Sequence, residues 1–148
     1  NLKKKLKKKV QTCQNKCIRF CLDMGNRDHI GVQKFKKINW LPTKERFEQC
    51  LLVSIYNFFN KRAPEYFDEM YYPAERGQKT RFSFQKLILS CRTTNRGLRM
   101  LSYLGPRLWN GLHTEIKSAS SANNFKHKMK NCFFTQLQKK EDSPYIYY

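Results

Sequence analysis

Apolar residues recur every three or four positions along most of the chain, which is the period of α-helices with one buried face. The first predicted helix carries an apolar stripe that we expect to face the core, formed by Leu6, Val10, Cys13, Cys17, Phe20 and Met24. Further helices are predicted over 32–38, 43–60, 64–70, a turn that begins at 105, and 121–137. The predicted fold class is therefore mainly α, a helical bundle of about five helices.

Local signals set the expected helix ends. Thr43, directly after a proline, is a plausible N-cap of the longest apolar helix, and Ser121 is a good N-cap of the last one. Gly25 is expected to stop the first helix. Gly105 and Pro106 predict the start of a helical turn with proline at its first position.

The remaining segments are polar or ambiguous. Residues 74–84 form an irregular basic connector, and 86–93 has the composition of a short strand without an obvious partner. A basic lead-in at 1–9 and a frayed tail at 138–148 are expected at the two ends. No repeat or Ser/Gly linker divides the chain, so 1–148 is predicted to be a single helical domain.

The helical stripes also predict which large side chains form the core. Trp109 lies in the stretch GPRLWNGL and is expected to act as a packing plug between the last two helical units. The predicted core consists of Trp40, Leu51, Ile55, Phe58, Leu108, Trp109, Phe125 and Phe133.

Charge is the most unusual property of the composition. The chain has 30 Lys and Arg against 11 Asp and Glu, a formal net charge of +19 in 148 residues. Six of the basic residues lie between Lys3 and Lys9, and subtracting these six from +19 leaves +13. A distributed excess of this size predicts a polyanionic partner, with nucleic acid ahead of a membrane or an acidic protein.

Membrane and secretory functions are not expected. The longest apolar run, at 50–59, is too short to span a bilayer, and no apolar stretch follows the basic start as a signal peptide requires. Cys13, Cys17 and Cys21 recur at a helical spacing that does not suit a disulfide, so the six cysteines are interpreted as reduced core residues. We therefore expect an intracellular protein, nuclear or cytoplasmic. Its start at Asn1 rather than Met suggests part of a longer polypeptide.

The chain offers no catalytic constellation, and we predict no catalytic residue. Its adjacent acidic pairs, Asp68 with Glu69 and Glu141 with Asp142, do not suit a two-metal site. Phosphate-loop, dinucleotide and zinc-protease motifs are missing from the sequence. Cys17 and Cys21 could hold zinc with a distant histidine, but no second close pair completes four ligands, so neither a metal nor a cofactor is predicted in this chain.

Alternating basic and aromatic residues are the remaining functional signal. Cations neutralise phosphates while aromatic rings stack on bases. The strongest such stretch lies in the polar connector, and the first helix adds lysines away from its apolar stripe. The predicted nucleic-acid contacts are Arg76, Lys79, Arg81, Phe82, Lys4, Lys5, Lys8, Lys16 and Arg19.

Three stretches resemble the region that follows the polymerase core in reverse transcriptases of non-LTR retrotransposons, and the first, LKKKVQTCQNKCIRFCL at 6–22, is similar to the Gln-, Asn- and Lys/Arg-rich helix that leads into it. The matches in 27–70 are His29-Ile30, Trp40-Leu41-Pro42, Arg46, Leu51-Leu52, Tyr56 and Ala63-Pro64-Glu65-Tyr66. The stretch 102–134 is similar to the closing segment of the same proteins, with Gly105-Pro106, Trp109-Asn110 and Phe125-Lys126, although His113 stands where the family usually has proline. Residues 76–95 match poorly.

The resemblance implies the thumb and post-polymerase part of an RNA-directed DNA polymerase. Such a region would grip template and primer, most naturally an RNA–DNA hybrid, beside an upstream polymerase core that carries the carboxylates and their divalent metals. Two alternatives stay open: a free-standing, domesticated RNA- or DNA-binding protein, and a secreted, cationic, cysteine-rich protein.

Overall fold

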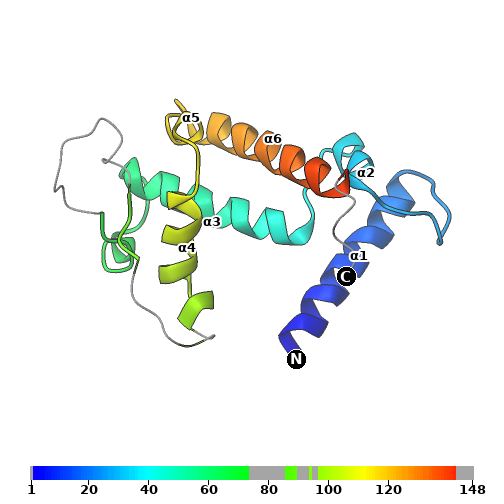
Figure 1. The fold of residues 1–148 in the computed structure, drawn as a ribbon, viewed down its shortest axis with the longest axis horizontal. Coiled ribbons are helices and arrows are strands. Elements are labelled where there is room, and N and C mark those ends of the chain that lie inside the picture. The colour runs from blue at the N-terminus through cyan, green and yellow to red at the C-terminus, as the bar shows by residue number, and fades with distance from the viewer. Residues whose placement is uncertain (1, 74–85, 90–93, 95–96, 143–148) are drawn as a thin grey trace. The chain divides into compact units, whose positions relative to one another are not determined.

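Helices dominate the computed structural model, which describes residues 2–73, 86–89, 94 and 97–142, apart from the side chains of residues 2–4 and 99. The α-helices are α1 (Leu2–Cys21), α2 (Val32–Lys37), α3 (Thr43–Phe59), α4 (Leu101–Asn110), α5 (Thr114–Lys117) and α6 (Ala122–Glu141) (Figure 1). Two 3₁₀ turns, η1 (Glu65–Phe67) and η3 (Gly97–Arg99), complete the described helices. The mainly α fold class is confirmed.

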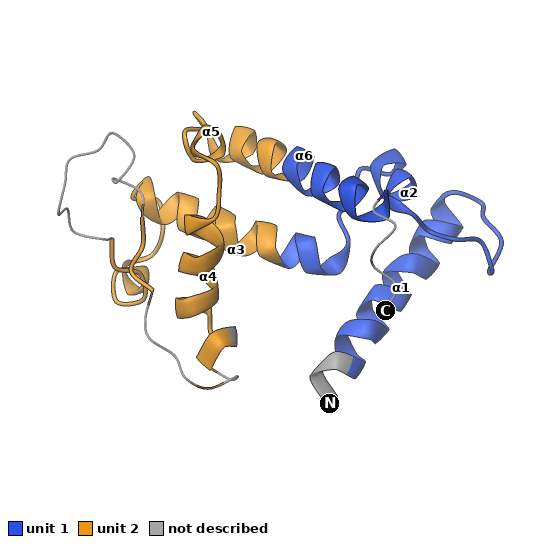
Figure 2. Cartoon of the chain, viewed as in Figure 1, with its two compact units in different colours: residues 1–47, 130–148 blue, residues 48–129 orange. Residues whose placement is uncertain are grey.

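The chain divides into two compact units, drawn in different colours in Figure 2. Unit 1 comprises residues 1–47 and 130–148, and unit 2 comprises residues 48–129. The boundaries between them fall inside α3 and inside α6. The sequence-based expectation that the two units fold together as one helical domain stays a prediction.

In unit 1, helix α1 packs through a face that carries glutamines. The Gln11 side-chain oxygen accepts the Thr43 backbone N–H at 3.0 Å and also accepts the Thr43 hydroxyl. Gln14 donates to the Leu41 carbonyl at 2.8 Å, and Ile18 of the same face is fully buried. Thr43 therefore begins α3 with Gln11 capping its free N–H, whereas the sequence predicted that Thr43 itself would be the cap.

The other contact inside unit 1 joins α2 to the end of α6. The Val32 backbone N–H donates to Glu141 Oε1 at 2.8 Å, and the Gln33 amide donates to Gln138 Oε1 at 2.9 Å. These bonds hold the last turn of α6, so the helix continues to Glu141. The prediction of a frayed tail from residue 138 was wrong for 138–141, and 143–148 lie outside the described residues.

Unit 2 is built around aromatic side chains. Tyr56 of α3 stacks on Phe125 of α6 with ring centroids 4.6 Å apart, and its hydroxyl donates to the Ala119 carbonyl at 2.7 Å. Trp109 of α4 stacks on Phe59 of α3 at 5.1 Å. The indole thus joins α4 to α3 inside this unit.

Helix α4 begins four residues before the predicted start at Gly105. Met100 is its N-cap, and Pro106 lies inside the helix, where both it and Gly105 are buried. Pro106 has no N–H to give the preceding turn, yet the helix continues through it, and Gly105, Pro106 and Trp109 are its buried residues. A Cβ on Gly105 would lie 2.9 Å from Ile55 Cδ1 and from Tyr71 Oη, so any larger residue would force these side chains to move.

Of the predicted strand at 86–93, only 86–89 are described; there the chain forms a single antiparallel bridge between Pro73 and Leu87, and the described residues contain no strand. The Ile88 N–H donates to the Tyr72 carbonyl at 2.8 Å. On its other side, Leu87 is held by a side chain: its N–H donates to Asn110 Oδ1 at 3.0 Å, and its carbonyl accepts from Asn110 Nδ2 at 2.8 Å. The side-chain amide of Asn110 therefore pairs the backbone N–H and C=O of Leu87, as a neighbouring strand would.

Several local predictions are confirmed and others need correction. Ser121 caps α6, because its hydroxyl accepts the Asn124 N–H at 3.1 Å. Helix α1 ends at Cys21, before Gly25, and Asp23 then adopts a left-handed φ of 50°. The helix expected over 64–70 is reduced to η1 and turns.

The predicted core is largely present, with one error among its large side chains. Leu51, Ile55, Trp109, Phe125 and Phe133 are buried, whereas Phe58 and Leu108 are half-buried. Trp40 was predicted in the core but is 41% exposed. Its neighbour Leu41 takes the inward position, since adjacent residues of a non-helical segment point in different directions.

The apolar stripe of α1 and the cysteines were also assigned wrongly to the core. Cys13, Cys17, Cys21 and Cys50 are exposed, and Cys132 is half-buried. All five are free thiols, and Cys91 lies outside the described residues. The reason on α1 is that the glutamine face, and not the stripe, packs against the rest of unit 1.

Candidate nucleic-acid interface

Helix α1 presents three faces with different chemistry. At about 100° per residue, Gln11, Gln14 and Ile18 form the docking face described above. The apolar stripe from Leu6 to Phe20 lies roughly 120° away, and a third face, about as far from both, carries cations. We call this third face the basic face and define it by Lys5, Lys8, Lys16 and Arg19.

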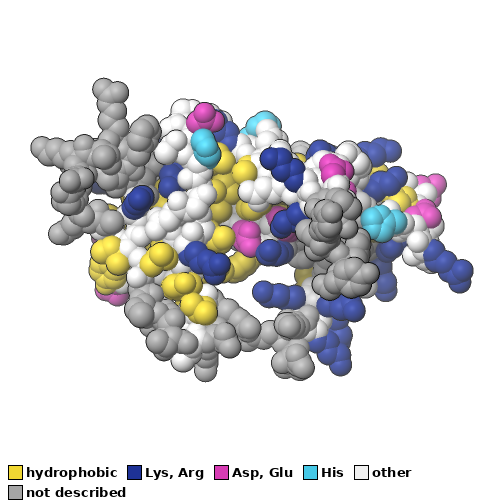
Figure 3. Space-filling view, viewed as in Figure 1, with side chains coloured by type: hydrophobic (Ala, Val, Ile, Leu, Met, Phe, Trp, Pro, Cys, Tyr) yellow, Lys and Arg dark blue, Asp and Glu magenta, His cyan; other side chains and the backbone are white. Residues whose placement is uncertain are grey.

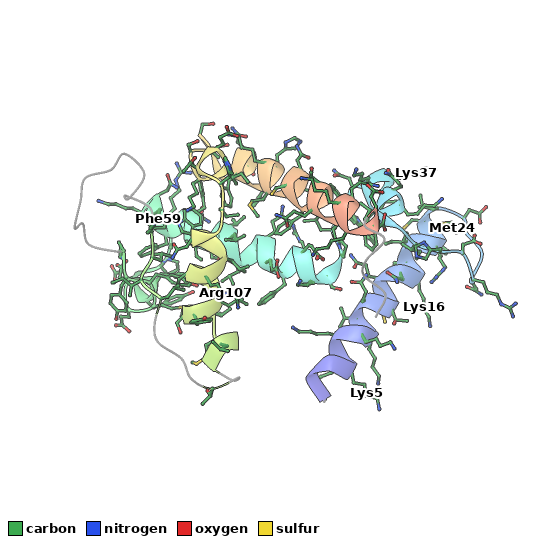
Figure 4. All side chains as sticks on the ribbon, viewed as in Figure 1. Lys5, Lys16, Met24, Lys37, Phe59 and Arg107 are labelled. Carbon is green, nitrogen blue, oxygen red and sulfur yellow. The ribbon has the colours of Figure 1, made fainter. Side chains whose placement is uncertain are left out.

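The lysines of the basic face are exposed and follow one another along the helix. Lys5, Lys8 and Lys16 all face solvent, and Figure 4 labels Lys5 and Lys16 on α1. Lys and Arg side chains are dense over the part of Figure 3 where α1 lies. From Lys5 to Lys16 the helix rises about 16 Å, which matches about five phosphates of one strand along a duplex axis. This face can therefore track a nucleic-acid backbone.

Arg19, at the end of the basic face, also forms hydrogen bonds with the loop after α1. Its Nε and Nη2 atoms donate to the Asp28 carbonyl at 3.3 and 3.0 Å, which ties the loop after α1 to the helix. The Asp28 carboxylate in turn accepts the Gly25 N–H at 2.8 Å. Arg19 thus contributes positive charge to the face while two of its donors stabilise the loop.

The charge pattern of α1 works against the stability of the isolated helix. Its twenty residues include seven lysines, one arginine and no acidic residue, and six of the lysines lie in its first half. The N-terminal end of a helix favours negative charge, and like charges four residues apart repel each other. A pattern that opposes helix formation in this way is relieved when a polyanion neutralises the lysines.

The predicted contacts in the connector cannot be placed beside this face. Arg76, Lys79, Arg81 and Phe82 lie outside the described residues, as does the Lys4 side chain. Their assignment as nucleic-acid contacts stays a prediction.

Lys117 is a buried cation among the described residues of unit 2. Lys117 of α5 places Nζ 5.6 Å from the centre of the Trp109 ring and is only 9% exposed. Burial, and to a lesser extent the positive charge of Lys86, lowers the pKa of Lys117 below its usual range. Because its ammonium group contacts the indole, Lys117 stabilises the packing of Trp109 and is not available to a phosphate.

Acidic and thiol groups do not assemble into a metal site in the described part of the chain. No cluster of three or more His, Cys, Asp or Glu side chains occurs there. Asp68 and Glu69 are exposed after η1, and Glu141 is engaged by the Val32 N–H. The lysines of the basic face, in contrast, can donate charge-assisted hydrogen bonds to phosphate oxygens.

Gln11, Gln14 and Asn110 are the important polar residues that the sequence reasoning missed. The only available signal was that Gln11 and Gln14 share a helix face with Ile18. Asn110 gave no local signal, since its partner Leu87 lies 23 positions earlier in the chain.

Comparison with protein families, with curated proteins and with solved structures found no match. Among the helices of the described residues, none combines the length and the hydropathy needed to cross a membrane.

Proposed function

We propose that this chain is a nucleic-acid-binding region of an RNA-directed DNA polymerase of the non-LTR retrotransposon type. It holds template and primer through its basic surface, and the polymerase carboxylates belong to another part of the same protein. Its role is binding, without chemistry of its own, and the expected ligand is an RNA–DNA hybrid. Its expected location is the nucleus or cytoplasm.

The observation that carries the binding function is the basic face of α1. Three exposed lysines are aligned on a helix without acidic residues, in a chain whose formal net charge is +19. Phosphate contacts by such a surface supply most of the affinity of a protein for nucleic acid and make it depend on salt.

The polymerase assignment rests on the resemblance of 27–70 and 102–134 to the post-polymerase region of that family. The packing of Trp109 is in keeping with it, because a thumb must hold its helices rigidly to position a duplex. No other feature of the described residues bears on this part of the proposal.

The binding function is tested by fluorescence anisotropy of a labelled RNA–DNA hybrid titrated with the whole chain over a salt series. Each phosphate contact contributes about 0.9 to the slope of log K against log salt on a duplex. The triple variant Lys5→Ala, Lys8→Ala, Lys16→Ala is therefore expected to lower that slope by up to about 2.7.

The matched control removes the same charge from another surface. Lys126, Lys139 and Lys140 of α6 are exposed, so changing these three to alanine lowers the net charge equally without touching α1. A smaller loss of slope is expected. Equal losses in both triple variants would show that the basic face is not the binding site, and a folded wild type that does not bind at low salt overturns the function itself.

The polymerase part has a separate test in the coding sequence. A continuous upstream reading frame that encodes polymerase carboxylates is expected. A frame that is closed directly upstream overturns the polymerase assignment and leaves a free-standing nucleic-acid-binding protein.

Titration of the native protein with a thiol reagent is expected to count all six cysteines, whereas disulfides would favour the secreted alternative.

A further inference from the structure

The apolar stripe of α1 is an exposed surface that the proposed function does not use. Its five residues within the helix are Leu6, Val10, Cys13, Cys17 and Phe20. All of them are exposed; the exposed fractions are 55% for Leu6, 53% for Val10 and 88% for Phe20. A contiguous apolar surface of this kind marks a site of interaction more often than chance exposure does.

The spacing along the stripe is that of a coiled-coil seam. The steps between its residues are four, three, four and three, so Val10 and Cys17 occupy one core position of a heptad and Leu6, Cys13 and Phe20 the other. The seam covers about 80° of the helix circumference, narrower than the roughly 100° face of a helix that packs on a protein core. A narrow seam suits one partner helix better than a flat lipid surface, which favours a wide apolar face.

The residues beside the seam define the charge of the partner. Lys9 and Lys16 flank it on one side, and Lys7 flanks it on the other. All three are exposed, and α1 has no acidic residue with which a second copy of itself could pair them. Two α1 helices packed side by side would bring the eight basic residues of one copy next to the eight of the other, and these would repel each other. This favours a partner whose flanking positions are acidic.

We propose that the apolar stripe of α1 binds, in coiled-coil fashion, an amphipathic helix with acidic flanks that belongs to another protein. The centre of the stripe lies roughly 120° around the helix from the centre of the basic face, and Lys16, at the border, belongs to the basic face and also flanks the stripe. The proposal therefore does not depend on nucleic-acid binding, and α1 could hold a helix and a nucleic acid at the same time.

The test uses the whole chain and three synthetic peptides of four heptads each. The first has leucine at both core positions and glutamate at both flanking positions. The second is a scrambled isomer of the first, and the third replaces the flanking glutamates with lysines. Anisotropy of each labelled peptide measures its affinity under reducing conditions, which keep the exposed thiols of the stripe free.

The Glu-flanked peptide is expected to bind at least about tenfold more tightly than either of the others. The double variant Val10→Gln, Phe20→Gln should lose that preference and keep the salt slope for the RNA–DNA hybrid. A matched double variant, Ile88→Gln and Leu89→Gln, removes two exposed apolar residues of unit 2 and should bind the peptide normally.

Several results would overturn the proposal. Equal binding of the Glu-flanked and scrambled peptides would mean that charge alone attracts them. Undiminished binding by the Val10→Gln, Phe20→Gln variant would place the site elsewhere. No peptide binding, together with self-association or anionic-vesicle binding that this variant abolishes, would assign the stripe to a second copy or to lipid.

Discussion

Replacement of Trp109 by alanine is the most direct test of how unit 2 is held together. The indole is fully buried and stacks on Phe59 with an interplanar angle of 21°. It also lies 5.9 Å from the Phe125 ring, and Lys117 Nζ is 5.6 Å from its centre. Trp109→Ala therefore removes contacts with α3, α5 and α6 at once.

The expected loss in the free energy of unfolding is about 3–5 kcal/mol. This figure combines the lost transfer of a large aromatic side chain with the cavity left among side chains that cannot fully collapse. Proteins of this size are stable by roughly 5–15 kcal/mol, so the variant should unfold at a much lower urea concentration. Trp109→Phe keeps an aromatic ring against Phe59, so its free energy of unfolding should fall less than that of Trp109→Ala.

Urea denaturation followed by far-UV circular dichroism measures the effect. Trp40→Ala is the matched control, because Trp40 is the other tryptophan of the chain and is 41% exposed. The free energy of unfolding of Trp40→Ala should be less than about 1 kcal/mol below that of wild type. A loss below about 1 kcal/mol for Trp109→Ala, or equal losses at both positions, would refute the assignment of Trp109 as the packing plug.

The contact with Lys117 adds a coupling that can be measured on its own. A double-mutant cycle of Trp109→Ala and Lys117→Met should give an interaction energy of about 0.5–2 kcal/mol between the cation and the ring. A coupling near zero would show that the ammonium group sits beside the indole without stabilising it.

Three further predictions concern other residues. Tyr71→Phe should raise stability by about 1 kcal/mol, since the Tyr71 hydroxyl is buried without a hydrogen-bond partner among the described residues. Burial also raises the pKa of Tyr71 above 10.0, so the unfolded chain ionises first and wild type loses stability as pH rises from about 10 through the folded-state pKa; urea titrations should show this alkaline loss in wild type and not in Tyr71→Phe. Asn110→Asp should lower the thermal midpoint more than Asn110→Ala, because a carboxylate would face the Leu87 carbonyl; the reverse order would contradict the two-bond contact. The triple variant Arg76→Ala, Lys79→Ala, Arg81→Ala should flatten the salt dependence of hybrid binding without changing the urea midpoint, and an unchanged slope would remove these residues from the interface.

The helices with local signals could be predicted well from the sequence. Helix α3 combines a proline before its first residue with buried positions at Leu51 and Ile55, and α6 begins at the Ser121 cap as expected. In both, the signals that mark the helix, namely the proline and apolar period of α3 and the serine cap of α6, lie within a few residues of one another, so a sequence pattern is enough to identify the helix.

The features that were missed depend on partners far away in the chain. The stripe of α1 had the periodicity of a buried face, but α1 docks through the face on which Gln11 accepts the Thr43 N–H and Gln14 donates to the Leu41 carbonyl, near the start of α3. The close approach of Gly105 to Ile55 and Tyr71, which lie far away in the chain, likewise had no local signal. Periodicity identifies an amphipathic helix, but it does not say which of its faces finds a partner.

The cap that Gln11 provides makes the start of α3 depend on a residue 32 positions earlier. Truncation is therefore not a neutral operation on this chain. A shortened chain that begins after α1 would keep every residue of α3, yet its first turn would lose the Gln11 acceptor and the Leu41 carbonyl would lose Gln14. Amide hydrogens near Thr43 would then exchange faster, so α1 belongs to the smallest piece in which α3 is complete.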